Sequence, residues 1–312
     1  MDVLMVGSVA YDSVTSPAGA VEDALGGSAV YAGIASRFHG NYLGLKKIGL
    51  VGVVGQDFRS EDFKLLESQG LDLSGLEIAE GKTFRWEGSY HGDMGVASTH
   101  DTQLNVFGDF DPKVPAGANS PTVLFCANLV PSLQSKVLQQ ARGRRLSMLD
   151  SMNLWIEIAR DDLLDVMRSV DLIIINDGEV KMLANDDNLI KASKQLRQMV
   201  DCQTLIVKKG ENGVLAFHND AIIALPAYPT ENVVDPTGCG DSFAGTIAAC
   251  LSTGSGEITR EELREALVKA TVTASFTLES FGTSGLLSLT EESFNNRPVS
   301  YTHLTLPTTR YV

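Results

Sequence analysis

The sequence predicts an α/β fold in which a mostly parallel sheet is covered by helices on both faces. Short runs of β-branched and apolar residues alternate with amphipathic stretches of helical length, and this alternation is typical of parallel sheets. Two regions, residues 71–110 and 204–228, interrupt the alternation with strand-like segments. The first of them indicates a small β-sheet that stands apart from the main one.

The alternating segments follow one another from the N-terminus onward. The apolar runs predict strands at residues 3–6, 48–54, 122–125, 146–149 and 172–175. Helical patterns are present at residues 28–38, 58–69, 131–142, 154–169, 179–183 and 189–199. Gly70 stands just after the second helical pattern and is suited to end it.

The two irregular regions predict strands without intervening helices. Residues 82–90 alternate polar and bulky side chains and no helical pattern follows them, so a small sheet such as a lid is expected within residues 71–110. Residues 204–228 predict consecutive strands, with turns at Gly210 and Gly213.

The last long helix is predicted at residues 259–278. Thr259 and Glu262 stand three positions apart at its start, which is the spacing of a capping box. Leu263 and Leu267 lie on one face of the segment, so this face is expected to pack on the sheet.

Composition and charge limit the classes of partner. The chain has 312 residues and a formal net charge of −14 at pH 7, which disfavours nucleic acid and anionic membranes. A small phosphate-bearing ligand stays compatible, because backbone amides bind phosphate whatever the net charge. The cysteines form no zinc motif or disulfide framework, and neither a signal peptide nor a membrane span is recognisable. We therefore expect a cytoplasmic protein.

The C-terminal residues differ in character from the rest of the chain. Residues 299–304, Val-Ser-Tyr-Thr-His-Leu, resemble the translation of a transposon end used to build sequencing libraries. We therefore expect one domain over residues 1–298 and a non-native tail over residues 299–312, to which no function is assigned.

The segment with the clearest chemical character leads into an apolar helix at residues 242–251. Gly238 and Gly240 flank Cys239, so the backbone can turn sharply and direct successive amides into one concavity at the helix start. Together with the helix dipole, such a concavity suits a phosphate group. Asp241 adjoins it, and a carboxylate there suits removal of a proton from an incoming hydroxyl. The alternative is that Asp241 only caps the helix.

The run from Asp235 to Asp241, Asp-Pro-Thr-Gly-Cys-Gly-Asp, resembles the second signature of the ribokinase-like (PfkB) family of carbohydrate and nucleoside kinases. The family usually has alanine where this chain has Cys239. Shorter motifs match in the family's order, and together they are specific although each alone is weak. They are Asp12 after the first strand, the glycine pair Gly26-Gly27, the Asn-x-x-Glu motif of Asn176 and Glu179, and the turn from Lys209 through Gly210 to Gly213.

The resemblance implies a doubly wound central sheet with a β lid at about residues 82–107, and a kinase that transfers the γ-phosphoryl group of ATP to a hydroxyl. It implies that Asp241 is the general base and that the amides of Gly238, Cys239 and Gly240 form an anion hole. The residues that it implies for contact with the sugar are Asp12, Gly26 and Gly27.

The resemblance also implies sites for the nucleotide and for cations. The residues implied for ATP are Asn176, Lys209, Gly210, Gly213 and Thr237. Glu179 would hold Mg²⁺ through water, although a surface acid is the alternative for this residue. Asp235 would lie at a site for a monovalent cation such as K⁺.

The order of strands supports one shared site. Asp12, Asp150, Asn176 and Asp235 each follow the end of a predicted strand. In an open α/β sheet the ligand crevice lies outside the carboxyl ends of the strands, so these side chains are expected to converge.

These observations predict an ATP-dependent kinase of a small carbohydrate such as a ribose-like sugar. An adenosine-type purine-nucleoside kinase and a non-catalytic sugar-binding regulator are the alternatives. Phe84 and Trp86 in the lid segment could stack on a base or sugar, or form the apolar face of the lid itself. A homodimer formed through the lid is compatible with the sequence.

Overall fold

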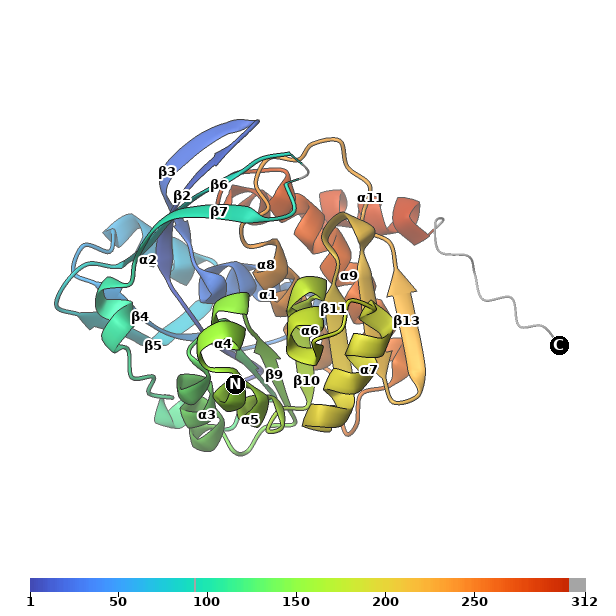
Figure 1. Cartoon of the computed structure of the whole chain (residues 1–312). Helices are drawn as coiled ribbons and strands as arrows, with labels where there is room; N and C mark the ends of the chain where they lie inside the picture. The colour runs from blue at the N-terminus through green and yellow to red at the C-terminus, as the bar shows by residue number, and fades with distance from the viewer. Residues whose placement is uncertain (93, 303–312) are drawn as a thin grey trace.

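The computed structural model describes residues 1–92 and 94–302. Within this part the chain forms a main sheet with strand order β13-β12-β11-β10-β9-β8-β1-β4-β5 and a separate sheet with order β3-β2-β6-β7 (Figure 1). The strands from β11 to β5 are parallel to their neighbours, whereas β12 and β13 are antiparallel. The α/β fold with a doubly wound, mostly parallel sheet and a β lid is thus confirmed.

The bounds of the elements are as follows. The strands of the main sheet are β1 (Val3–Val6), β4 (Ile48–Gly55), β5 (Leu71–Ala79), β8 (Val123–Cys126), β9 (Leu146–Asp150), β10 (Leu172–Asn176), β11 (Thr204–Lys208), β12 (Val214–His218) and β13 (Ala221–Leu225). The strands of the second sheet, called the lid below, are β2 (Ala10–Ser16), β3 (Gly19–Gly26), β6 (Phe84–Tyr90) and β7 (Ala97–Gln103). The helices are α1 (Ser28–Leu43), α2 (Ser60–Ser68), α3 (Pro131–Gln140), α4 (Asn153–Ile158), α5 (Arg160–Met167), α6 (Asp177–Ala184), α7 (Leu189–Val200), α8 (Cys239–Leu251), α9 (Arg260–Leu278), α10 (Ser284–Leu287) and α11 (Glu291–Thr302).

The main sheet is buried on both faces. Along β1, Val3 and Met5 belong to the core that includes α1, α8 and α9. Leu4 and Val6 belong to the core that includes α3, α5 and α7. Alternate side chains of one strand therefore enter opposite cores, which explains the uninterrupted apolar runs in the sequence.

The lid contains more of the chain than the sequence analysis expected. Strands β6 and β7 lie inside the expected segment 82–107, but β2 and β3 complete the lid from the N-terminal region. Strand β5, which the sequence analysis grouped with the irregular region, pairs with β4 at the edge of the main sheet. Pairing partners far apart in sequence decide these assignments, and local patterns do not contain them.

The helix expected over residues 154–169 is two helices. Ala159 separates α4 from α5 with φ −145° and ψ 38°, outside the helical region. Arg160 follows, and its guanidinium donates a hydrogen bond to the carbonyl of Leu183 on α6. The segment holds no glycine or proline, and this contact with another helix lies directly after the break.

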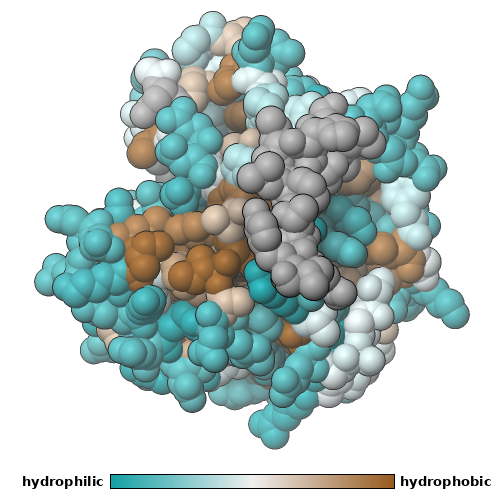
Figure 2. Space-filling model, turned by 90° about the vertical axis from the view of Figure 1, so that its right-hand side faces the viewer, coloured by the Kyte–Doolittle hydropathy of each residue, from teal (hydrophilic) through white to brown (hydrophobic). Residues whose placement is uncertain are grey.

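Two further features concern the surface and the C-terminus. Figure 2 shows the side of the molecule that carries β13, where hydrophilic residues cover most of the surface and an apolar band crosses it. No helix within residues 1–92 and 94–302 has the length and hydropathy needed to cross a membrane. The expected tail begins within α11, and its residues 303–312 lie outside the described residues.

Candidate active site

Helix α8 begins where the chain turns at Gly238. This residue has a φ of 76°, in the left-handed region that favours glycine. A Cβ at this position would collide with the ring of Tyr31. No side chain caps the first turn of α8, because its N-cap is Gly238, and the amide of Cys239 donates to the carbonyl of Pro236 at 3.1 Å. The chain thus builds a helix start of the kind that binds phosphate.

Asp241 lies in the first turn of α8 and is half-buried. Loss of water around its carboxyl raises its pKa to about 7, and the carboxylate of Asp150 adds to this rise while the ammonium of Lys208 opposes it. The N-cap of α8 is Gly238, and Asp241 is the acidic residue of its first turn, where its carboxylate accepts from its own backbone amide, so a contribution to the helix start and a role as base are compatible. A carboxyl group with a pKa near 7 is suited to act as a base at neutral pH.

Lys208 is a member of the site that the sequence analysis did not identify. It is the last residue of β11, and its Nζ lies 2.8 Å from Oδ2 of Asp150 at the end of β9. A Cβ on Gly240 would lie 2.9 Å from the same Nζ, so the ammonium lies against the first turn of α8. A lysine that ends an otherwise apolar strand was the signal that could have indicated it.

Asn176 and Glu179 form a capping box at the start of α6. The Asn176 side chain accepts from the Glu179 amide, and the Glu179 carboxylate accepts from the Asn176 amide, both at 2.8 Å. Glu179 is buried rather than a surface acid. Its pKa is raised by burial and by Asp150, and Lys208 opposes the rise.

Asp12 enters the site from the lid and not from the end of a main-sheet strand. It is buried in β2, and a Cβ on Gly26 would collide with its carboxylate. Burial raises its pKa to about 7, the amide of Gly27 lowers it, and the charges of Asp235 and Asp241 raise it further. Asp12 comes after β1 in the chain, as expected, but residues 10–16 are themselves a lid strand, so the lid carries this side chain.

Asp235 holds the loop before α8 in place. Its two carboxylate oxygens accept from the amides of Thr237 at 2.9 Å and Gly282 at 3.3 Å, and the side chain is fully buried. The hydroxyl of Thr237 in turn donates to the hydroxyl of Tyr90 in β6 at 3.3 Å. Lid and body thus meet directly beside the start of α8.

The turn after β11 and the thiol of Cys239 lie at the margin of this cluster. Lys209 directs its Nζ to the carbonyl of Asn212 at 3.4 Å, so the structure does not bring it to the carboxylates. Gly213 passes so close to the backbone of Leu225 that a Cβ would collide. The Cys239 thiol contacts the carbonyl of Ala274 at 3.6 Å, and burial with nearby carboxylates raises its pKa.

The carboxylates suit a cation that keeps most of its water better than a metal ion coordinated directly by several side chains. Within the described part of the chain no group of three or more His, Cys, Asp or Glu side chains is arranged to hold a metal ion. Mg²⁺ commonly keeps several waters and is held by one or two carboxylates and by phosphates of a substrate. Glu179, buried near Asp150 and Lys208, is compatible with that kind of contact.

Comparisons with known proteins show one family, and a solved structure shares the fold. The model of the pfkB family of carbohydrate kinases matches residues 5–289. Cytidine kinase of Thermococcus kodakarensis is 30% identical over 259 residues, 81% of this chain and 90% of that protein. Nucleoside kinase of Methanocaldococcus jannaschii is 25% identical over 260 residues, 77% of each. The structure of Burkholderia thailandensis nucleoside kinase in complex with inosine has a TM-score of 0.78 at 18% identity and covers 96% of this chain and 99% of its own.

Proposed function

This chain belongs to the pfkB family of carbohydrate kinases, and from this premise we propose that it is a nucleoside kinase. Kinases of this family transfer a phosphoryl group to an alcohol acceptor. The observation that carries the proposal is the half-buried Asp241, with a pKa of about 7, in the first turn of a glycine-started helix. Base and anion hole are thereby adjacent, as phosphoryl transfer to a hydroxyl requires.

In the proposed reaction Asp241 removes the proton from a ribose hydroxyl. The hydroxyl oxygen forms a bond to the γ-phosphorus of ATP, and the bond from that phosphorus to the bridging oxygen breaks, so that ADP leaves with the electron pair. The amides of Gly238, Cys239 and Gly240 stabilise charge on the transferred group. Asp12 in the lid accepts hydrogen bonds from the other sugar hydroxyls.

The remaining motif residues would serve the nucleotide and the cations. Mg²⁺ would neutralise charge on the ATP phosphates, and Glu179 with Asn176 would hold its waters. The turn from Lys209 to Gly213 would line the nucleotide site, as would Thr237. A monovalent cation at Asp235 would share the carboxylate with two amides, since both oxygens of this residue already accept from amides.

Two observations favour a nucleoside over a free sugar. The two relatives reported above by sequence are a cytidine kinase and a nucleoside kinase. Val14, Tyr90 and Met94 also form an apolar cluster with partly buried neighbours that include Trp86. Asp12 and Trp86 are paired neighbours on parallel strands, so they share one face. An aromatic ring beside the sugar-binding aspartate suits a nucleobase.

The test is ADP release with MgATP and a panel of cytidine, adenosine, inosine and free ribose. We expect turnover with at least one nucleoside and little with ribose. Asp241→Asn should lose roughly 100-fold or more in kcat while still binding ATP, because it removes the base. Asp111→Asn on the surface is the matched control and should behave as the wild type. Turnover on ribose but on no nucleoside, or full activity of Asp241→Asn, would overturn the proposal.

A further inference from the structure

Lys208 combines two properties that an ion pair alone does not need. Its side chain is 21% exposed, whereas that of its partner Asp150 is 6% exposed. Lys208 is therefore the less enclosed partner of the pair. Its ammonium adjoins Gly240 in the first turn of α8, where an added Cβ would lie 2.9 Å from Nζ.

The charges around Lys208 are otherwise negative. Carboxylates gather at the site from five positions, listed in chain order: Asp12, Asp150, Glu179, Asp235 and Asp241. Among the described lysines and arginines, Lys208 is the one that forms an ion pair with a member of this set. A phosphoryl group that enters the site is itself negative, so a cation at its position is needed to offset the carboxylates.

The Asp150 side chain is held without Lys208. Its Oδ1 accepts from the amide of Ser151 at 2.9 Å. Lys208, by contrast, donates to Asp150 and to no second group within the described residues. An ammonium group has three donors, so two N–H groups are left for a ligand beside Gly240.

We propose that Lys208 is a catalytic residue, whose ammonium contacts the phosphoryl group while it passes from ATP to the acceptor. This inference rests on the proposed function and adds a side chain to the anion hole of backbone amides. Lys208 gives up no proton in the step: Asp241 takes the proton of the hydroxyl, and the bridging oxygen leaves with ADP. Asp150 is a positioning residue, which holds the ammonium over Gly240.

The ammonium stays protonated in this position. Burial alone would lower the pKa of Lys208, but the charges of Asp150, Glu179 and Asp241 together with the hydrogen bond that Lys208 donates to Asp150 raise it overall. The side chain therefore carries its charge at neutral pH.

The experiment compares Lys208→Met, Asp150→Asn and the double variant. If Lys208 serves only the ion pair with Asp150, either single change breaks that pair and the losses of activity should be equal. If Lys208 contacts the phosphoryl group, that contact is lost only when Lys208 is replaced. We expect kcat to fall about 100-fold or more in Lys208→Met, and less than about tenfold in Asp150→Asn, which keeps the ammonium. The double variant removes the unpaired carboxylate and should stay as inactive as Lys208→Met. Lys47→Met breaks a surface pair of similar length, 3.0 Å to Asp72, and should match the wild type.

A binding measurement gives a readout that does not depend on turnover. By calorimetry, Lys208→Met should bind a non-hydrolysable ATP analogue about tenfold more weakly than the wild type, since a charge-assisted hydrogen bond to the γ-phosphoryl is lost. Its affinity for ADP should change far less. Thermal unfolding of each variant shows that the chain is folded.

The outcomes separate this inference from the proposed function. Recovery of activity in the double variant, or equal losses in the two single variants, would mean that Lys208 serves only the ion pair and would overturn the inference. So would unchanged binding of the ATP analogue. A wild type that turns over no nucleoside counts against the proposed function, while the comparison of ATP analogue with ADP still tests Lys208.

Discussion

At the scale of single residues, the site depends on carboxyl groups that are shielded from water. The pKa values of Asp12 and Asp241 are both raised to about 7, mainly by burial. Only Asp241 adjoins the start of α8, and Asp12 contacts the amide of Gly27 instead. The position relative to the amides, rather than the pKa, therefore separates the proposed base from the proposed sugar ligand.

A pH dependence follows for the wild type. A base works only when it is deprotonated, so kcat/KM should fall about tenfold per pH unit below a pH near 7 and level off above it. The charged groups that act on Asp241 are Asp150 and Lys208, with Asp12 facing it from the lid. Initial rates between pH 5.5 and 9 check this, with folding confirmed at each pH. A flat profile over that range would exclude Asp241 as the base.

At the scale of elements, the two capping boxes and the start of α8 differ in what they require. Thr259 and Glu262 cap α9 as the sequence predicts, because a capping box needs only residues three positions apart. The start of α8 also requires a residue without a side chain at position 238, because the ring of Tyr31 on α1 occupies the place that a Cβ would take. Glycine is thus required at this position both by the neighbouring helix α1 and by the left-handed backbone conformation.

Substitution of this glycine should show the difference. Gly238→Ala should destabilise the protein by more than about 1 kcal/mol, since left-handed strain is combined with overlap with Tyr31, and should abolish activity. Gly44→Ala is the matched control: Gly44 has a φ of 72°, and a Cβ there would meet nothing within 4 Å. It should cost only about 1 kcal/mol and keep activity. Chemical denaturation and initial rates measure both, and equal behaviour of the two variants would contradict the role of Tyr31.

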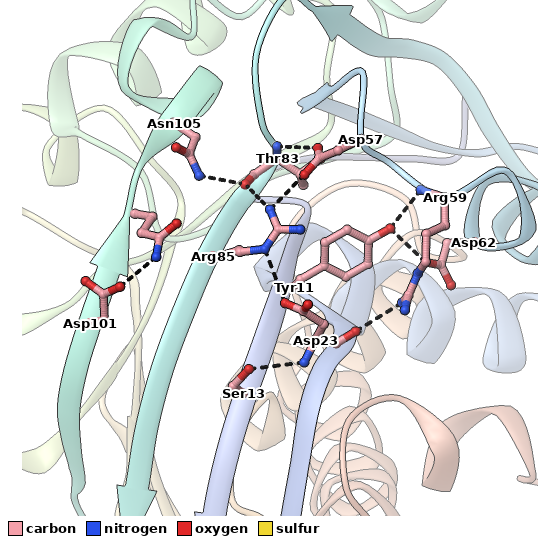
Figure 3. Close-up of polar contacts among 11 residues, drawn as sticks. Tyr11, Ser13, Asp23, Asp57, Arg59, Asp62, Thr83, Arg85, Asp101 and Asn105 are labelled. Carbon is pink, nitrogen blue, oxygen red and sulfur yellow. Dashed lines mark hydrogen bonds and ion pairs between the residues drawn. The ribbon is translucent and has the colours of Figure 1, made fainter.

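At the scale of the whole molecule, a polar network joins the lid to the main body (Figure 3). Arg85 of β6 binds Asp57 in the body at 2.8 Å and Asp23 of β3 at 3.2 Å. The hydroxyl of Tyr11 in β2 donates to Asp62 of α2 at 2.8 Å and accepts from the amide of Arg59. Because Asp12 is the next residue along β2, this network determines where the proposed sugar ligand lies.

Loss of Arg85 should therefore act on substrate binding. We expect Arg85→Ala to raise the KM for the nucleoside about fivefold, with a smaller change in kcat, since half-exposed ion pairs contribute little energy each and the lid still carries Asp12. Lys136→Ala on α3, which removes the exposed ion pair with Asp111, is the control. A KM equal to that of the wild type would show that the lid is held without this network.

The sequence by itself determined the α/β alternation, the capping box at Thr259 and the glycine-rich start of α8 with Asp241. These features depend on residues that are neighbours along the chain. Only the tertiary structure decided that β2 and β3 belong to the lid, that Asp12 enters the site from it, and that Lys208 lies between Asp150 and Gly240. The physical reason is that strand pairing and charge contacts join segments far apart in the sequence, such as those of Asp12 and Asp241, and no local pattern records such a partner.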